Sequence, residues 1–279
     1  MKISVMSLFR DSEQYIDRTL KQFESMNNIE NVEFEYFFYE NDSKDNTRKL
    51  LNSWCDNNNG RLIYEDKGYP KFGSINYLER FILLAYYRNT LKRFLIDNTD
   101  SDYTIIVDSD LVFNNKCIEK LIQYKDYNDC AMMTGNSRCA IRSEIFSKCM
   151  NSYYDVAPFR DSLGGSGLLW ADCPSKLEKD LELWKKGNPI RVQSAFGGIA
   201  ILKTKYLKEV YWSSHGEGVE HMEFCYRLHE FGDIYSLSCA KCYITDAIVP
   251  ENYKQATRIK QTQDKNILKQ YENIISNNP

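Results

Sequence analysis

The 279-residue sequence has little net charge, because 36 Lys and Arg residues face 39 Asp and Glu residues, giving a formal charge of −3. Without a basic excess, it lacks the electrostatic signature of a dedicated nucleic-acid-binding protein. It also lacks any stretch approaching 18 consecutive apolar residues, so we expect no transmembrane segment. The first apolar run, residues 3–8, is too short for a secretory signal and has strand character. These absences favour a cytoplasmic protein with no nucleic-acid partner.

The sequence also lacks the cysteine pattern of a disulfide framework. Its nine cysteines are an odd number spread over a long chain, so we expect reduced, mostly buried thiols. Cys239 and Cys242 form one C-x-x-C pair, whereas a structural zinc site would need a second pair. There is no internal repeat and no low-complexity linker, and the proportions of 43% hydrophobic and 27% charged residues are ordinary for a globular protein.

The first half of the chain alternates strand-like and helix-like segments. Apolar strand patterns occupy residues 3–8, 34–39, 61–64 and 103–107, and helical patterns lie between them. This alternation predicts an α/β fold with a mostly parallel sheet and right-handed crossovers. A helix at 114–124 and a strand at 131–134 continue it, and Asp11 with Gln14 resembles a capping box that opens the first helix.

The second half is less regular. Prolines and the Gly164–Gly167 stretch interrupt residues 135–190, which predicts a loop-rich insertion on the ligand side of the sheet. Beyond it we expect a strand at 199–202, a helix at 218–231, a strand at 244–249 and a polar helix at 258–275.

Two carboxylates follow the most strand-like run of the chain. Residues 103–107 are apolar and largely β-branched, and Asp108-Ser109-Asp110 comes next. Open α/β sheets bind ligands at the carboxyl ends of their strands, and residues two apart in a strand point the same way. Asp108 and Asp110 could therefore share a hard divalent cation, Mn²⁺ or Mg²⁺, that carries a phosphorylated ligand. A D-x-D motif alone is a weak signal, because a solvated turn after a strand has the same sequence.

Other motifs occur in a fixed order around this pair. They are Glu40-Asn41-Asp42-Ser43-Lys44-Asp45-Asn46-Thr47, Tyr87-Arg88-Asn89, Tyr153-Tyr154-Asp155, Phe159-Arg160-Asp161, Phe196-Gly197-Gly198 and Gly218-Val219-Glu220-His221. Together with the D-x-D motif they resemble the nucleotide-sugar-dependent glycosyltransferases of the GT-A fold. Their order is similar to that of the fungal capsule-associated mannosyltransferase group and its bacterial and viral relatives. The resemblance covers about residues 1–250.

The resemblance implies a metal-dependent glycosyltransferase, and a hexosyltransferase is expected. It would move a sugar from a UDP- or GDP-sugar donor to a glycan, lipid-linked or protein acceptor. It implies one GT-A-like domain over residues 1–279, with a nucleotide-binding half (1–134), an acceptor-side half (135–250) and a C-terminal helix (251–279).

The resemblance also assigns roles to single residues. Glu220 would be the general base, and Asp110, Asp108 and His221 would be metal ligands. The donor-binding residues would be Glu40, Asp42, Arg88, Asp108, Gly197 and Gly198, and the sugar or acceptor contacts would be Asp155, Arg160 and Asp161.

Several alternatives stay open at this stage. Asp42 and Asp45 could cap a helix, and Glu220 could be a helix-terminal carboxylate instead of a base. Related enzymes supply a metal-ligating histidine near the end of the domain, but no histidine follows His229. Either His221 takes that role, water completes the shell, or the metal is held less tightly. The fungal group is retaining, whereas a base at Glu220 suits inversion.

Two other functions are compatible with such a fold. A sugar-1-phosphate nucleotidyltransferase would carry a glycine-rich phosphate loop after its first strand, where this chain has Leu8-Phe9-Arg10-Asp11-Ser12. A non-catalytic protein that binds glycans or nucleotides could keep the same sheet and the same acids.

Overall fold

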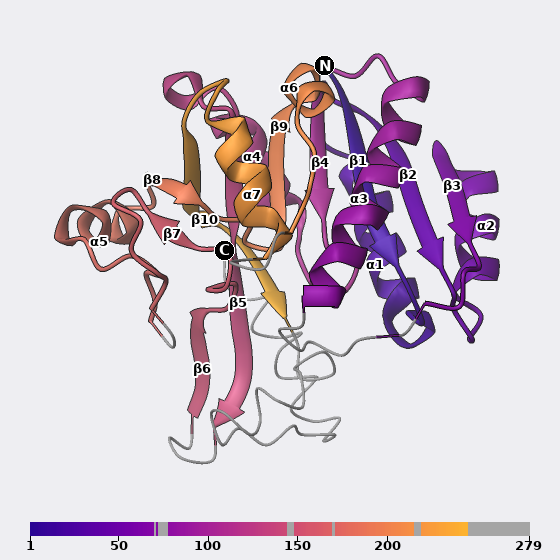
Figure 1. Cartoon of the computed structure of the whole chain (residues 1–279), viewed down its shortest axis with the longest axis horizontal. Helices are drawn as coiled ribbons and strands as arrows, with labels where there is room; N and C mark the ends of the chain where they lie inside the picture. Colours follow the sequence, from indigo (N-terminus) through magenta and orange to yellow (C-terminus); the bar gives the residue numbers. More distant parts are fainter. Residues whose placement is uncertain (70, 72–77, 144–147, 169–170, 215–218, 245–279) are drawn as a thin grey trace.

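The computed structural model describes residues 1–279 except 70, 72–77, 144–147, 169–170, 215–218 and 245–279. Within that part, ten strands form one sheet with the order β3-β2-β1-β4-β9-β5-β10-β8-β7, and β6 pairs with β5. Helices lie on both sides of the sheet (Figure 1), which confirms the expected α/β class.

The first four strands form the parallel half of the sheet that the sequence predicts. They are β1 (Lys2–Phe9), β2 (Glu33–Asn41), β3 (Gly60–Glu65) and β4 (Tyr103–Val107). β1 pairs in parallel with β2 and β4, and β2 pairs in parallel with β3. Their carboxyl ends therefore meet along one edge of the sheet (Figure 1).

The second half makes the sheet mixed instead of mostly parallel. β9 (Ile199–Lys203) lies antiparallel between β4 and β5 (Met132–Ser143). β10 (Ile234–Ile244) is parallel to β5 and antiparallel to β8 (Pro189–Ser194). β6 (Lys148–Tyr153) and β7 (Arg160–Asp161) complete the antiparallel pairs.

The prediction of a loop-rich region at 135–190 is wrong for residues 135–143, 148–153 and 178–185, which belong to β5, β6 and a helix. β5 continues past 134 although Thr134, Asn136 and Ser137 are polar and buried there. The Asn136 amide donates to the Ser238 carbonyl (2.7 Å), beside the register shift between β5 and β10. The last described strand is also earlier than expected, at 234–244; residues 245–249 and the expected C-terminal helix lie outside the described residues.

The helices divide between two hydrophobic cores, one on each face of the sheet. α1 (Glu13–Met26), α2 (Thr47–Asn57) and α4 (Asn115–Tyr124) supply the first core. The second is covered by α3 (Leu78–Asn98), α5 (Glu178–Lys185), α6 (Thr204–Glu209) and α7 (Glu220–Leu228). A 3₁₀ turn spans Tyr127–Asp129. None of the helices in the described ranges combines the length and apolarity that crossing a membrane requires.

Both faces of the sheet are buried because successive strand residues alternate between the two cores. In β2, Tyr36 and Phe38 belong to the first core, and Phe37 and Tyr39 belong to the second. A strand that is covered on both sides reads as a continuous apolar run, which explains the patterns in the sequence.

The loops before α1 and α2 cap each other, and the predicted capping box does not form. Asp45 accepts from the Glu13 backbone N–H (3.0 Å), and the Glu13 carboxylate accepts from the Asn46 N–H (3.0 Å). Asp11 has φ 45° and accepts from the Lys44 N–H (2.8 Å) instead of capping its own helix. The Glu40–Thr47 motif thus fixes the ends of β1 and β2 relative to each other.

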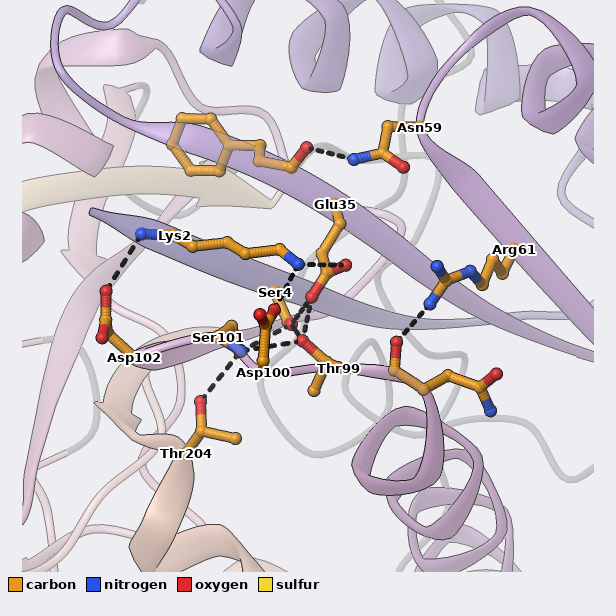
Figure 2. A network of polar contacts seen from close by, with 12 residues as sticks. Lys2, Ser4, Glu35, Asn59, Arg61, Thr99, Asp100, Ser101, Asp102 and Thr204 are labelled. Atoms are coloured by element: carbon orange, nitrogen blue, oxygen red, sulfur yellow. Dashed lines mark hydrogen bonds and ion pairs between the residues drawn. The ribbon is translucent and has the colours of Figure 1, made fainter.

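A polar network lies near the amino-terminal ends of β1, β2 and β4, far from the carboxyl ends of the same strands (Figure 2). Glu35 is 3% exposed and pairs with the Lys2 ammonium (Oε2–Nζ 3.4 Å). Its other oxygen accepts from the Ser4 hydroxyl (2.8 Å) and from the Thr99 hydroxyl. A buried carboxylate is tolerated here because a charge and two hydroxyls satisfy it.

We expect Glu35→Ala to lower the free energy of unfolding by about 1–3 kcal/mol, because Lys2 and two hydroxyls would each lose one of their partners. Urea denaturation measures the change. Glu33→Ala, at an exposed position of the same strand, serves as the control and is expected to have little effect. Equal stability of the two variants would show that the network contributes nothing to the fold.

Candidate functional site

A cleft of about 340 Å³ opens at the carboxyl ends of β1 and β4. Its lining comes from the segments after these two strands, from α3, from the start of α7 and from two segments of the second half of the chain. The lining includes Arg10, Arg88, Asp108, Asp110, Asp155, Phe196, Glu220 and His221. Half of the residues that the motifs assign to the site therefore line one cleft, and the other half do not.

Helix α1 fixes the loop that carries the two aspartates. The Thr19 hydroxyl donates to the Ser109 carbonyl (2.7 Å), and the Arg18 guanidinium donates to the Asp110 carbonyl (3.2 Å). From the other side, the Asp108 backbone N–H donates to the Gly198 carbonyl (2.9 Å). Because the backbone is held on both sides, the two carboxylates face the cleft in a defined arrangement.

Arg88 joins the D-x-D segment to helix α7. This buried arginine of α3 lies 3.1 Å from Asp108 Oδ1 and, through its other terminal nitrogen, 3.1 Å from Glu220 Oε1. The Arg88 and Glu220 side chains are 6% and 4% exposed, so the pair is shielded from solvent. A desolvated guanidinium between two carboxylates holds both in place, because either one alone would be a costly buried charge.

The acids of the cleft are close enough to influence one another. Burial raises the pKa of Asp108 to about 8; Arg88 opposes the shift, and the charges of Asp110, Asp155 and Glu220 add to it. The Asp108 side chain is 42% exposed and lines the cleft. Burial also raises the pKa of Asp110. A cation bound between them would favour their ionised forms.

The donor set suits a cation that is shared with a ligand. Within the described residues, no three His, Cys, Asp or Glu side chains are grouped so that they could hold a metal ion. Mg²⁺ and similar ions are commonly bound by one or two carboxylates together with substrate phosphates and water. Asp108 and Asp110 fit that description, since their carboxylates face a cleft large enough for a ligand.

Gly197 and Gly198 support the site from behind and are absent from the lining of the cleft. Both have positive φ, 64° and 71°, and a Cβ on Gly197 would lie 2.1 Å from the Gly135 carbonyl oxygen. The Gly197 N–H donates to Asp155 Oδ2 (2.8 Å). Asp155 lines the cleft, and burial raises its pKa to about 6.

His221 lies in an aromatic setting. Its ring stacks on Phe196 (centroids 3.8 Å apart, planes at 14°), and the Trp212 indole N–H donates to its Nδ1 (3.3 Å). Asn89 holds Trp212 in turn, donating to its carbonyl (2.7 Å) and accepting from its N–H (3.0 Å). The Tyr87-Arg88-Asn89 motif thus serves both acidic and aromatic parts of the site.

Besides Gly197 and Gly198, four predicted site residues lie outside the lining of the cleft. Glu40 is fully buried and pairs with Arg48, and the Asp42 carboxylate accepts from the Lys67 and Gly68 N–H groups (2.8 and 2.7 Å). Both organise the loops beside the cleft.

In the second half of the chain, Arg160 donates to the carbonyls of Ala157 and Phe159. Asp161 accepts from the N–H groups of Leu163 and Gly165, so it shapes a turn. The structure does not bring this pair to the cleft that holds Asp155.

Sequence reasoning missed other residues that line the cleft or support it. They are Tyr15, Lys71 and Arg80 in the lining, and Trp212 behind His221. Arg80 lies two turns before Arg88 on α3, so the helical spacing could have indicated it. Nothing local marks Trp212, because its contact with Asn89 spans more than a hundred residues of sequence.

No protein-family model matches the sequence, and no curated protein matches it either. Solved structures do match. The fragment 1–349 of TarS from S. aureus, in complex with UDP-GlcNAc, has a TM-score of 0.55 at 16% identity over 88% of this chain. GalNAc-T7 with UDP, GalNAc and Mn²⁺ has a TM-score of 0.58 at 12% identity over 88% of this chain. The mannosyltransferase PcManGT from Pyrobaculum calidifontis, in complex with GDP-Man and Mn²⁺, has a TM-score of 0.54 at 12% identity over 92%.

The chain spans 58%, 44% and 59% of these three proteins, respectively. At such low identity the likeness establishes the fold alone, which is the GT-A fold that the motifs predict.

Proposed function

We propose that this chain is a glycosyltransferase that uses a nucleotide-diphosphate sugar and a divalent cation. The observation that carries the proposal is the cleft in which Asp108 and Asp110 face a shared space with the Arg88–Glu220 pair. The named ligands of the structural neighbours, UDP-GlcNAc and GDP-Man, and the Mn²⁺ of two of them support it. A hexose donor and a relation to the capsule-associated mannosyltransferase group stay predictions. The division of the chain into a nucleotide-binding half and an acceptor-side half also stays a prediction, as does a glycan, lipid-linked or protein acceptor.

The residues of the cleft have distinct proposed tasks. Asp110 and Asp108 would hold a Mn²⁺ or Mg²⁺ ion, which supplies Lewis-acid stabilisation of the departing diphosphate. Arg88 keeps Asp108 and Glu220 apart at fixed positions. Glu220 would accept the proton of the acceptor hydroxyl as that oxygen attacks the anomeric carbon. Asp155 would contact the sugar or the acceptor.

Asp110→Ala is expected to weaken Mn²⁺-dependent binding of UDP or GDP about a hundredfold, since even residues that only orient metal ligands can matter by 10- to 100-fold. Calorimetry with and without Mn²⁺ measures the change. Asp97→Ala, at an exposed position of α3, is the control. Metal-dependent affinity that survives in Asp110→Ala would remove Asp110 from the ligand set.

The nucleotidyltransferase alternative is less consistent with the site. The end of β1 lines the cleft with Phe9, and Arg10 follows, so bulky side chains stand where a nucleotidyltransferase would have a glycine-rich loop. Arg10 also donates to the Tyr69 carbonyl (2.7 Å). Incubation with a nucleoside triphosphate and a sugar phosphate distinguishes the two activities, because only a nucleotidyltransferase would release pyrophosphate.

A further inference from the structure

The second side-chain nitrogen of His221 has no role in the site described so far. The residue is 6% exposed and lines the cleft, and its Nε2 has no hydrogen-bond partner within the described part of the chain. The nearest charged oxygen, Glu220 Oε1, lies 3.8 Å away, which is too far for a hydrogen bond. A buried ring nitrogen without a partner in a ligand cleft calls for an explanation.

The proton position on this ring follows from its partner. An indole N–H can only donate, so the contact from Trp212 Nε1 uses the lone pair of Nδ1. A neutral imidazole has one donor and one acceptor nitrogen, and Nε2 must therefore carry the proton. A protonated ring is disfavoured, because it would oppose two N–H groups and because burial and the nearby Arg88 lower the pKa of His221.

We propose that His221 is a neutral hydrogen-bond donor whose Nε2–H binds an oxygen of the nucleotide-sugar donor, and that Trp212 sets this tautomer. The inference rests on the proposed function. It replaces the expected role of His221 as a metal ligand, since a nitrogen that carries a proton has no lone pair to offer a metal. The accepting oxygen belongs either to the diphosphate or to the sugar, and both present the same acceptor chemistry.

The ring is held so firmly that it can select a ligand. Phe196 covers one face of the imidazole, and Trp212 itself stacks on Phe224 with ring centroids 4.1 Å apart. Asn89 fixes the Trp212 backbone from α3, so the orientation is transmitted from the same helix that positions Arg88. A pre-oriented donor loses little side-chain freedom when a ligand binds.

Calorimetry compares His221→Phe with His221→Gln, because glutamine places an N–H near the position of Nε2 while phenylalanine has none. The probes are UDP-GlcNAc and GDP-mannose with Mn²⁺, and UDP and GDP alone. We expect His221→Phe to weaken nucleotide-sugar binding at least about tenfold, with His221→Gln recovering most of the loss. If UDP or GDP alone is weakened equally, the oxygen is a phosphate oxygen; if only the nucleotide sugar is weakened, it is a sugar oxygen.

Unchanged affinities in His221→Phe would overturn the inference. A loss of turnover without a loss of donor affinity would also overturn it, because that result would indicate that His221 contacts Glu220. If His221→Phe no longer binds Mn²⁺ in the absence of nucleotide, His221 is a metal ligand instead. Melting curves of both variants exclude misfolding as the cause.

The tautomer has its own test, which is independent of any activity. Nitrogen NMR of isotope-labelled histidine is expected to show His221 with a bare Nδ1 and a protonated Nε2, and Trp212→Phe is expected to abolish that preference. A proton on Nδ1 would contradict the inference directly. A wild-type chain that shows the tautomer but binds none of the four nucleotides would instead refute the proposed function.

Discussion

Glu220→Gln is expected to lower the rate of sugar transfer by about 100- to 10,000-fold while leaving the affinity for the donor unchanged. Glutamine keeps the shape of the side chain but cannot accept the acceptor's proton at neutral pH. Arg88 retains its contact with Asp108 (3.1 Å), so the cleft keeps its arrangement. Product formation is measured with the nucleotide sugar that the wild-type protein hydrolyses in the presence of Mn²⁺, and anomer analysis of the product gives the stereochemistry.

The control for this experiment is Glu230→Gln, which lies just beyond α7 at an exposed position. It is expected to transfer at the wild-type rate. If Glu220→Gln also does so, the assignment of the base is wrong, and Asp155→Asn becomes the decisive variant. The pKa of Asp155 is raised by burial to about 6, which also suits a general base near neutral pH.

Gly197→Ala is expected to lower the free energy of unfolding by about 3–5 kcal/mol, enough to unfold a large share of a marginally stable protein. Two effects combine there. The residue has φ 64°, which an L-residue adopts only with strain, and the new Cβ would lie 2.1 Å from the Gly135 carbonyl oxygen. Backbone cannot yield as a flexible side chain could. Chemical denaturation followed by circular dichroism measures the loss.

Gly68→Ala separates the two effects. Gly68 also has a positive φ, 68°, but nothing lies within 4 Å of the position of its Cβ. Only the conformational strain applies, so we expect a loss of about 1–2 kcal/mol. If both variants lose the same stability, the close approach to Gly135 is not what requires glycine at 197.

The sequence was most informative where local patterns determine structure. The apolar runs of β1 to β4 alternate with helices, and strands that are joined through a crossover helix pair in parallel with a right-handed connection. The pair Asp108 and Asp110 could be placed at an edge of the sheet because a strand ends just before them. Arg88 and Glu220 came from a motif resemblance, and the structure shows that they contact each other.

The features that sequence missed depend on partners distant in the chain. β5 runs to Ser143 because β10 and β6 pair with it, and its polar residues gave no sign of this. Asp11 accepts a hydrogen bond from the loop before α2, and Asp45, in that loop, accepts one from the start of α1. A capping box, in contrast, assumes that a helix is capped by residues of its own segment. Glu40 and Asp42 matched a motif, but the folded structure shows that they accept hydrogen bonds from the protein's own loops.

The position of β9 has a consequence for engineering the chain. This strand comes from the second half of the sequence but lies between β4 and β5, and the glycine turn before it touches both the Asp108 backbone and Gly135. A fragment ending at residue 134 would leave the hydrogen-bonding groups along one side of β4 without their partner strand, and such an edge is prone to self-association. Chimaeras with other proteins of this fold should therefore carry β9 together with β4, although nearly a hundred residues separate the two.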